Sequence, residues 1–357
     1  MKQRTVAFVG NCQLGTLASL YRRILPPEDA PEVVYLPSYE AASDAQMRVV
    51  AEADIVVHQV LDFAPRIGEL AASGTVHLVP HLTAFFLWPC TGHPHPSNQP
   101  HPYSDASGPY NTELGDSFLN RMLLDGVDPD EAVNRFMSTD IAAVRRADRM
   151  REIALDKQRS RDRACGYAFA DFIEANFQTQ YLFRSPNHPE IPLSIFLATE
   201  VFSRLGLHSK ILDDLQANPP RDLFPATQTP IHPSVIACFG LTCVTPDTRY
   251  RYFDEGFFNC SEYAGRYMRY EWNPLFGEAY EQRRSGQKDA ALATLRRAVE
   301  RSPRSAAGHA VIGDLLAEKG LFAEAAQFAR KALELDPENA HYKRRVEQIA
   351  SQLAKAG

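Results

Sequence analysis

A cysteine between two carboxamide side chains lies near the start of the chain, where the apolar run VAFV is followed by Gly10, Asn11, Cys12 and Gln13. If the run is a strand that turns directly into a helix, the first N–H groups of the helix can bind an anion or an oxyanion. Asn11 and Gln13 add neutral donors, and the helix dipole favours a thiolate at this position. Cys12 is therefore a candidate nucleophile; the competing interpretation is a small buried core residue, a common fate of a lone cysteine.

A histidine in the middle of the chain is the second candidate, in the stretch YLFRSPNHPEIP. Asn187, His188 and Pro189 form a proline-bounded turn, which would hold the imidazole on stiff backbone. The ordinary pKa of histidine suits a general base that takes a proton from a hydroxyl or from Cys12. Arg184 could pair with a phosphate. The alternative for His188 is an ordinary turn histidine near the surface.

The elements that must position these residues follow a βαβ rhythm in the first 90 residues. The expected strands are 5–9, 33–36, 54–60 and 75–79, and the expected helices are 13–24, 43–53 and 65–73. This series predicts an α/β fold with a short parallel sheet, right-handed crossovers and helices on its faces. Ligands bind such sheets at the carboxyl ends of the strands. Besides the turn at Gly10, that edge receives His58, Gln59 and His81, which become further candidates.

The Pro- and His-rich stretch TGHPHPSNQPHPYSDASGPY follows the sheet. It cannot be a helix or a central strand, so we expect a mobile loop that acts as a lid. His93, His95 and His101 could in principle bind a metal, but no nearby acid or cysteine completes a ligand set. The sequence therefore predicts no metal site here.

Residues 128–180 are strongly helical and basic, with acidic residues interleaved. We expect most of these charges to form a solvated face with pairs along the helix. One or two of the basic residues could turn toward a phosphate, and the sequence does not identify which. The basic residues are Arg145, Arg146, Arg149, Arg151, Lys157, Arg159, Arg161 and Arg163.

Composition limits the class of protein. The chain has 357 residues, of which 45% are hydrophobic and 23% charged, which is typical of a folded protein with room for two domains. A net charge of -6 argues against a general nucleic-acid binder. The apolar stretches are too short for a signal peptide or a membrane span, and the scattered cysteines suggest neither a disulfide framework nor structural zinc. We therefore expect a cytoplasmic protein.

The C-terminal part repeats itself at the 34-residue period of tetratricopeptide repeats. Gly286 matches Gly320 and Pro303 matches Pro337, with small residues matched between them. This resemblance predicts helical hairpins over 271–357, closed by an amphipathic helix. Their concave face could bind a protein partner or mediate self-association, or the repeats could be a stabilising appendage.

Four features also occur in one order along the chain: the Gly-Asn-Cys-Gln turn, the strand ADIVVHQ, the run FFLWP and the stretch LFRSPNHP. Together they resemble the WcbI-like polysaccharide biosynthesis family over roughly residues 4–270. The resemblance implies a protein that binds coenzyme A or acetyl-CoA and is proposed to O-acetylate a sugar or precursor of a capsular or exopolysaccharide. It places Cys12 with its neighbours, Gln59 and His188 around the active cleft. We accordingly expect an acetyltransferase domain over 1–270 and a tetratricopeptide region over 271–357.

The resulting hypothesis is a sugar O-acetyltransferase with Cys12 and His188 as catalytic residues. The expected coenzyme-binding residues are Gly10, Asn11, Gln13, His58, Gln59, His81, Arg184 and Asn187. Two other functions stay open. One is an SGNH-like carbohydrate esterase with Cys12 in place of the usual serine, although the expected Asp-x-x-His element is missing. The other is a non-catalytic scaffold that acts through its tetratricopeptide region.

Overall fold

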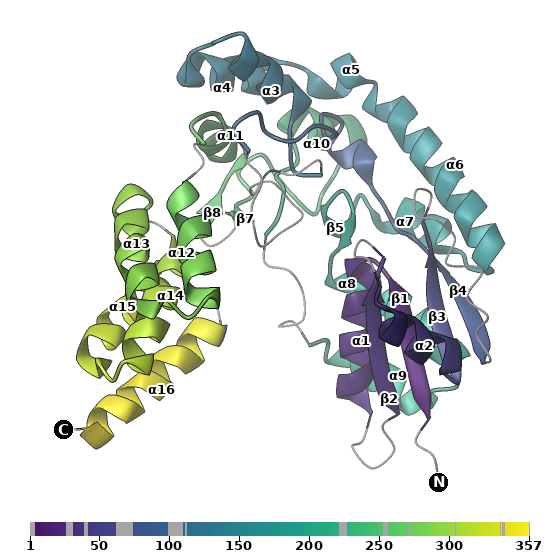
Figure 1. Ribbon diagram of the computed structural model, residues 1–357. Helices are drawn as coiled ribbons and strands as arrows, with labels where there is room; N and C mark the ends of the chain where they lie inside the picture. The colour runs from purple at the N-terminus through teal and green to yellow at the C-terminus, as the bar shows by residue number, and fades with distance from the viewer. Residues whose placement is uncertain are drawn as a thin grey trace. The chain divides into compact units, whose positions relative to one another are not determined.

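The computed structural model describes residues 4–25, 31–38, 42–61, 74–98, 110, 113–220, 227–252, 256–270, 273–303, 305–335, 337 and 340–356. These residues form two compact units (Figure 1). The first unit comprises Met1–Pro89, Ala142–Pro225 and Ser234–Thr245. The second comprises Cys90–Ile141, Ala226–Pro233 and Pro246–Gly357. The predicted domain boundary after residue 270 stays a prediction.

A parallel four-stranded sheet forms the centre of the first unit and confirms the predicted α/β fold. Its strands are β1 (Thr5–Gly10), β2 (Glu32–Pro37), β3 (Ile55–Val60) and β4 (Thr75–Pro80), in the order β2-β1-β3-β4. The register pairs Val6 with both Val33 and Ile55. All four strands end at one edge, to which the turn after Gly10 also belongs. The expected helix over 65–73 lies outside the described residues.

The other elements of the first unit surround this sheet. They are α1 (Cys12–Ile24), α2 (Asp44–Glu52), η2 (Phe85–Leu87), α5 (Ile141–Arg145), α6 (Ala147–Cys165), α7 (Phe169–Asn176), β5 (Phe183–Ser185), β6 (His188–Pro189), α8 (Ile191–Arg204), α9 (Ser209–Ala217) and α10 (Pro233–Phe239). Successive side chains of β1 point to opposite faces of the sheet, so their contacts show which helices cover each face. Val9 packs in one cluster with Val50 of α2. Phe8, on the opposite face, meets Tyr21 of α1 at 5.7 Å between ring centroids, and Tyr21 meets Phe202 of α8 at 5.1 Å. Helices α1 and α8 therefore share one face of the sheet.

Helix α6 is the long basic helix that the sequence predicts, and it packs against β4, η2 and α7. Part of its charge is paired on the solvent side: Arg149 with Glu152, and Arg159 with both Asp156 and Glu174. These exposed pairs contribute little to stability, about 0–1 kcal/mol each. Lys157 and Arg161 of the same helix instead line a groove.

The second unit combines an aromatic core with the C-terminal helices. Its elements are α3 (Ser117–Leu124), α4 (Pro129–Ser138), β7 (Tyr250–Tyr252), β8 (Gly256–Phe258), α11 (Cys260–Met268), α12 (Pro274–Arg284), α13 (Lys288–Arg301), α14 (Ala306–Glu318), α15 (Phe322–Leu335) and α16 (Ala340–Ala356). The rings of Tyr110, Tyr263 and Tyr267 are buried together between α11, β7 and the segment after β4. This cluster forms the core between α3, α4 and α11.

His95 belongs to this aromatic core, which corrects the expectation of a mobile lid for the described part of its segment. The side chain is 2% exposed, its Nε2 lies 3.0 Å from the carbonyl oxygen of Tyr267, and its ring meets Tyr267 and Tyr270 edge to face. Burial lowers the pKa of His95 to about 4. His95 is therefore a neutral core residue. Residues 99–109, with His101, lie outside the described residues.

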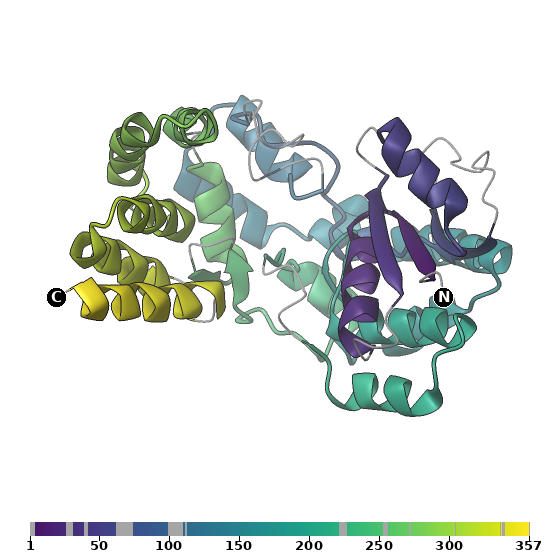
Figure 2. The ribbon, with the colours of Figure 1, turned by 60° about the horizontal axis from the view of Figure 1, so that its bottom comes forward.

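Helices α12 to α16 confirm the predicted tetratricopeptide arrangement (green to yellow in Figure 2). Gly286 and Gly320 lie in the turns within the two hairpins, at φ 79° and 75°, a backbone region that glycine adopts without strain. The repeated alanines are buried where the helices touch: Ala291, Ala298, Ala325 and Ala332. Binding of a partner or self-association through this region stays a prediction. Within the described residues, no helix has the length and apolar character needed to cross a membrane.

Candidate functional site

The site begins at the turn from β1 into α1. Asn11 is the N-cap of α1, and its Oδ1 accepts a hydrogen bond from the Gln13 backbone N–H at 3.0 Å. Gly10 is required by close packing: a Cβ at this position would lie 2.7 Å from Cβ of Gln59 and 2.8 Å from Cγ of Leu14. The cap therefore places Cys12 in the first turn of the helix, as the sequence predicts.

The carboxamide of Gln13 joins three segments of the first unit. Its Nε2 donates to the carbonyl oxygens of Leu82 and Asn187, both at 2.8 Å. Its Oε1 accepts from Nε2 of Gln59 at 3.0 Å and from the Leu82 N–H at 3.2 Å. Oε1 of Gln59 in turn accepts from the Asn11 N–H at 2.9 Å. This amide network fixes the tips of β1, β3 and β4 and the β5–β6 hairpin relative to one another.

The network corrects the prediction that the Gly-Asn-Cys-Gln amides together face a ligand. The Asn11 N–H is used by Gln59, the Gln13 N–H by the cap, and both Nε2 hydrogens of Gln13 by carbonyl oxygens. Buried amides satisfy their hydrogen bonds within the protein wherever they can. Among the described residues, Nδ2 of Asn11 has no hydrogen-bond acceptor, so it is the side-chain donor that the turn can offer.

The β5–β6 hairpin presents His188. Oγ of Ser185, a residue only 2% exposed, lies 2.6 Å from Nδ1 of His188, and the two residues are register partners in the hairpin. If Nδ1 donates its proton to Oγ of Ser185, Nε2 carries the lone pair and can accept a proton. Ser185 was not among the predicted site residues, although its spacing of three residues from His188 fits a partner across a tight hairpin.

Arg184 does not reach the site, which corrects its assignment to a phosphate. The guanidinium is buried and forms an ion pair with Glu190, and neither described cavity is lined by it. Glu190 also caps α8 by accepting from the Ile191 N–H at 3.0 Å. A buried guanidinium requires such a partner, so the Arg184–Glu190 pair closes the hairpin that carries His188.

His58 also lies outside the site. Adjacent residues of a strand point to opposite faces, so Gln59 meets α1 while His58 lies on the face of Val56 and α2. Burial lowers the pKa of His58, and it lines neither described cavity. Both His58 and Gln59 were predicted to be site residues because both lie at the end of β3. The prediction did not consider that their side chains point to opposite faces of the sheet.

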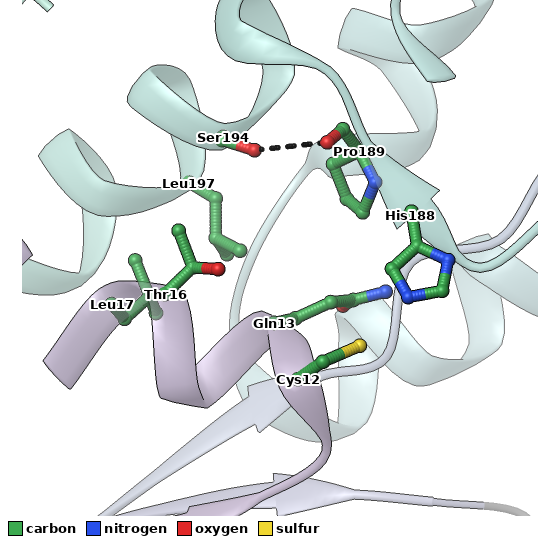
Figure 3. Close-up of a pocket in the computed structure, with 8 residues that line it drawn as sticks. All are labelled: Cys12, Gln13, Thr16, Leu17, His188, Pro189, Ser194 and Leu197. Atoms are coloured by element: carbon green, nitrogen blue, oxygen red, sulfur yellow. Dashed lines mark hydrogen bonds between the residues drawn. The ribbon is translucent and has the colours of Figure 1, made fainter. Parts of the chain in front are cut away.

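Cys12 and His188 line one small cavity (Figure 3). Its volume is about 20 Å³, and its walls come from α1, the β5–β6 hairpin and α8. The lining residues are Cys12, Gln13, Thr16, Leu17, His188, Pro189, Ser194 and Leu197. Figure 3 shows the Cys12 sulfur on the side of the His188 ring. The structure thus brings together the two residues that the sequence nominates for catalysis, from positions 176 residues apart.

A larger groove of about 390 Å³ lies along α6. It is lined by His81, Thr83, Phe85, Met150, Ile153, Ala154, Lys157, Arg161 and Asn187. Lys157 and Arg161 are four residues apart, so both project from the same face of α6. The groove therefore has apolar walls with two cations at one side. In the sequence, Lys157 and Arg161 cannot be distinguished from the neighbouring basic residues of the same helix.

The groove and the cavity adjoin at the hairpin. Asn187 lines the groove, His188 lines the cavity, and Gln13 lies in the cavity wall while donating to the Asn187 carbonyl. Of the predicted residues, His81 and Asn187 line the groove, and Cys12, Gln13 and His188 line the cavity. Gly10 and Asn11 form the turn from β1 into α1, which Gln59 holds through its hydrogen bond to the Asn11 N–H. The volume of the groove is that of a small-molecule site.

Other thiols are less suited to chemistry. Burial raises the pKa of Cys165 to about 11 and that of Cys260 to about 12, so both are neutral thiols near pH 7. None of the six cysteines forms a disulfide bond. In the described part of the chain, no cluster of three His, Cys, Asp or Glu residues could hold a metal ion.

Residues 5–210 match the family described as polysaccharide biosynthesis enzyme WcbI, and residues 276–340 match a tetratricopeptide repeat family. No curated protein matches the chain. A solved structure of WcbI, described as a novel polysaccharide biosynthesis enzyme and as the native protein without a disulfide bond between coenzyme A and a cysteine, has a TM-score of 0.55 at 18% identity. The match covers 83% of this chain and 99% of that one, and at this identity it shows a shared fold.

Proposed function

This chain belongs to the WcbI family of polysaccharide biosynthesis enzymes, and from that premise we propose that it is a coenzyme A-dependent O-acetyltransferase acting on a sugar of a capsular or exopolysaccharide. The observation that carries the proposal is the junction of the α6 groove with the cavity that holds Cys12 and His188. Coenzyme A consists of a long, weakly polar arm between phosphates and a thiol. A ligand of this kind needs an apolar groove, cations along it and a reactive end.

The residues of the groove fit coenzyme A. Phe85, Met150 and Ile153 offer apolar walls to the pantetheine arm, and Lys157 and Arg161 can pair with its phosphates. The side chain of Lys157 is exposed, so a phosphate can reach it from solvent without rearrangement of the packed core. Asn187 at the junction would then direct the thioester toward the cavity. Coenzyme A is also the ligand named for the solved WcbI structure, which supports this class of ligand here.

In the direct mechanism, His188 acts as the general base. The sugar hydroxyl attacks the acetyl carbonyl carbon while its proton moves to Nε2 of His188, with Nδ1 held by Ser185. The new C–O bond forms, the C–S bond breaks, and the departing coenzyme A thiolate takes the proton from His188. We assign the oxyanion to Nδ2 of Asn11, the residue before Cys12 in the chain; such a donor contributes about 3–4 kcal/mol in comparable sites.

In the covalent mechanism, Cys12 accepts the acetyl group first. Its sulfur, deprotonated by His188, attacks the thioester, and coenzyme A leaves as the thiol after taking that proton back. The sugar hydroxyl then attacks the acetyl group on Cys12 with His188 again as the base. The common cavity of Cys12 and His188 supports both mechanisms equally.

The binding claim is tested by calorimetric titration of coenzyme A. We expect saturable binding by the wild-type protein, with a rise in melting temperature on ligand addition. Replacing Lys157 or Arg161 by Ala should each weaken binding about 10- to 150-fold, the effect of losing one hydrogen bond to a charged group. Arg149→Ala is the matched control, because Arg149 lies on the same helix but pairs with Glu152 in solvent. An esterase or a scaffold predicts no binding at all.

The two mechanisms are separated by Cys12→Ala. Loss of acetyl transfer to the sugar, together with loss of an acetylated protein species in mass spectrometry, supports the covalent route. Full activity of Cys12→Ala eliminates that route and leaves direct transfer. Cys238→Ala is the control, because Cys238 is exposed and distant in sequence from the site residues.

A further inference from the structure

We infer that the small cavity between α1 and α8 is the pocket for the acyl chain, and that Leu197 limits the transferred group to acetyl. The inference rests on the proposed function, because it concerns the acyl group of the coenzyme A thioester. Leu197 is then a specificity-determining residue that is distinct from the reactive pair, Cys12 and His188.

The cavity has a reactive end and an apolar end. Figure 3 shows Cys12 and His188 at one end, with Thr16, Leu17 and Leu197 grouped at the other. Leu17 is 1% exposed and Leu197 2% exposed, so both are held in the packed layer between α1 and the neighbouring α8. Packed interiors adjust poorly to added volume. Leu17 and Leu197 therefore form a fixed wall at this end of the cavity.

The size of the cavity decides which acyl groups it accepts. In either mechanism the carbonyl carbon must lie near His188, and in the covalent mechanism also beside Cys12, so its alkyl tail must occupy the space next to them. A cavity of about 20 Å³ holds roughly one water molecule or one methyl group. A propionyl or butyryl tail would have to displace Leu17 or Leu197. One methylene in a hydrophobic pocket changes selectivity by about 10- to 200-fold.

The test compares affinities for a series of ligands without any sugar acceptor. Coenzyme A and the acetyl, propionyl and butyryl derivatives are titrated calorimetrically, using analogues in which a methylene group replaces the thioester sulfur so that no transfer occurs. We expect the wild-type protein to bind the acetyl analogue at least 10-fold more tightly than the butyryl analogue. Leu197→Ala should reduce this ratio to about 1 by opening the wall.

Leu193→Ala is the matched control. Leu193 lies one turn earlier on α8 and is fully buried, but it does not line the cavity. The two variants remove the same atoms from the same helix, so a loss of stability alone affects both. Leu193→Ala should therefore keep the wild-type preference for acetyl over butyryl. Circular dichroism at the titration temperature confirms that each variant is folded.

A second variant fills the cavity, so its effect on ligand binding does not come from removing atoms of the core. Thr16 is half-buried at the apolar end, so Thr16→Leu should weaken the acetyl analogue at least 10-fold while leaving coenzyme A binding within about twofold. Equal affinity of the wild type for acetyl and butyryl analogues, or an unchanged ratio in Leu197→Ala, would overturn the inference. Failure to bind coenzyme A would instead remove the proposed function, so the two failures are distinguishable.

Discussion

Removing the carboxamide of Gln13 is the sharpest test of how the site is assembled. In Gln13→Ala, four hydrogen bonds disappear, with lengths of 2.8, 2.8, 3.0 and 3.2 Å. A typical net contribution is about 0.5–1.5 kcal/mol per bond, so we expect the free energy of unfolding of the first unit to fall by about 2–6 kcal/mol. This is a large part of the total for an ordinary domain, about 5–15 kcal/mol.

The loss of stability in Gln13→Ala should be greatest at the β5–β6 hairpin. Because Nε2 of Gln13 holds the Asn187 carbonyl, the β5–β6 hairpin should open more often in Gln13→Ala, and its backbone amides should exchange with deuterium faster. The assay is urea unfolding followed by circular dichroism, together with hydrogen exchange of the hairpin read by mass spectrometry. The hairpin reports directly on the backbone that carries His188.

Gln158→Ala is the matched control for this change. Gln158 is 2% exposed on α6, and its Nε2 donates at 3.0 Å to Asp162, which also accepts from the Ala170 N–H of α7; Gln158 lines neither cavity. It should lower stability without selectively speeding exchange at the hairpin. The reasoning is refuted if Gln13→Ala costs less than about 1 kcal/mol, or if both variants change hairpin exchange equally.

Three further substitutions test other parts of the molecule. Gly10→Ala should cost about 1–3 kcal/mol of unfolding free energy and weaken coenzyme A binding, because its Cβ would meet Gln59 at 2.7 Å; unchanged melting and affinity would contradict this. Ser185→Ala should lower kcat for acetyl transfer, with little change in the KM for acetyl-CoA, since it frees the ring of His188 but does not line the groove; a change in KM alone would argue against this role. The imidazole of His95 binds a proton below about pH 6.5 in the unfolded chain but only below about pH 4 in the folded one, so stability should fall on acidification through this window, by up to about 3 kcal/mol. Comparing the free energy of unfolding at pH 7 and pH 4.5 in the wild type and His95→Phe checks this, and an equal acid loss in both proteins would refute it.

Most of the fold could be predicted from the sequence because the patterns that determine it involve residues close together in the chain. The β-branched runs and the turn after Gly10 follow from hydrophobic pattern and backbone sterics, and the repeated glycines at 286 and 320 mark turns that need positive φ. Each of these features depends on residues close together in the chain.

The site was accessible only in part, because its contacts are long-range. Cys12 and His188 could be nominated by residue type, yet Ser185 and the Lys157–Arg161 pair became visible only once the hairpin and α6 were placed beside α1 and β4. Gln13 and Arg184 were assigned to a ligand because a carboxamide and a guanidinium are good ligand donors. Burial instead commits both to partners within the protein.

The most direct test of the thioester site is a thiol–disulfide exchange with the oxidised disulfide of coenzyme A. The thiolate of Cys12 attacks one sulfur of that disulfide, which yields Cys12 joined to coenzyme A and releases one molecule of coenzyme A thiol. Mass mapping of the products at short times identifies the modified cysteine. If the groove delivers the thiol end of coenzyme A to the cavity, half-buried Cys12 reacts before exposed Cys238, and Lys157→Ala slows the reaction of Cys12 alone. Reaction at Cys238 first, with Cys12 unmodified, would contradict the proposed site.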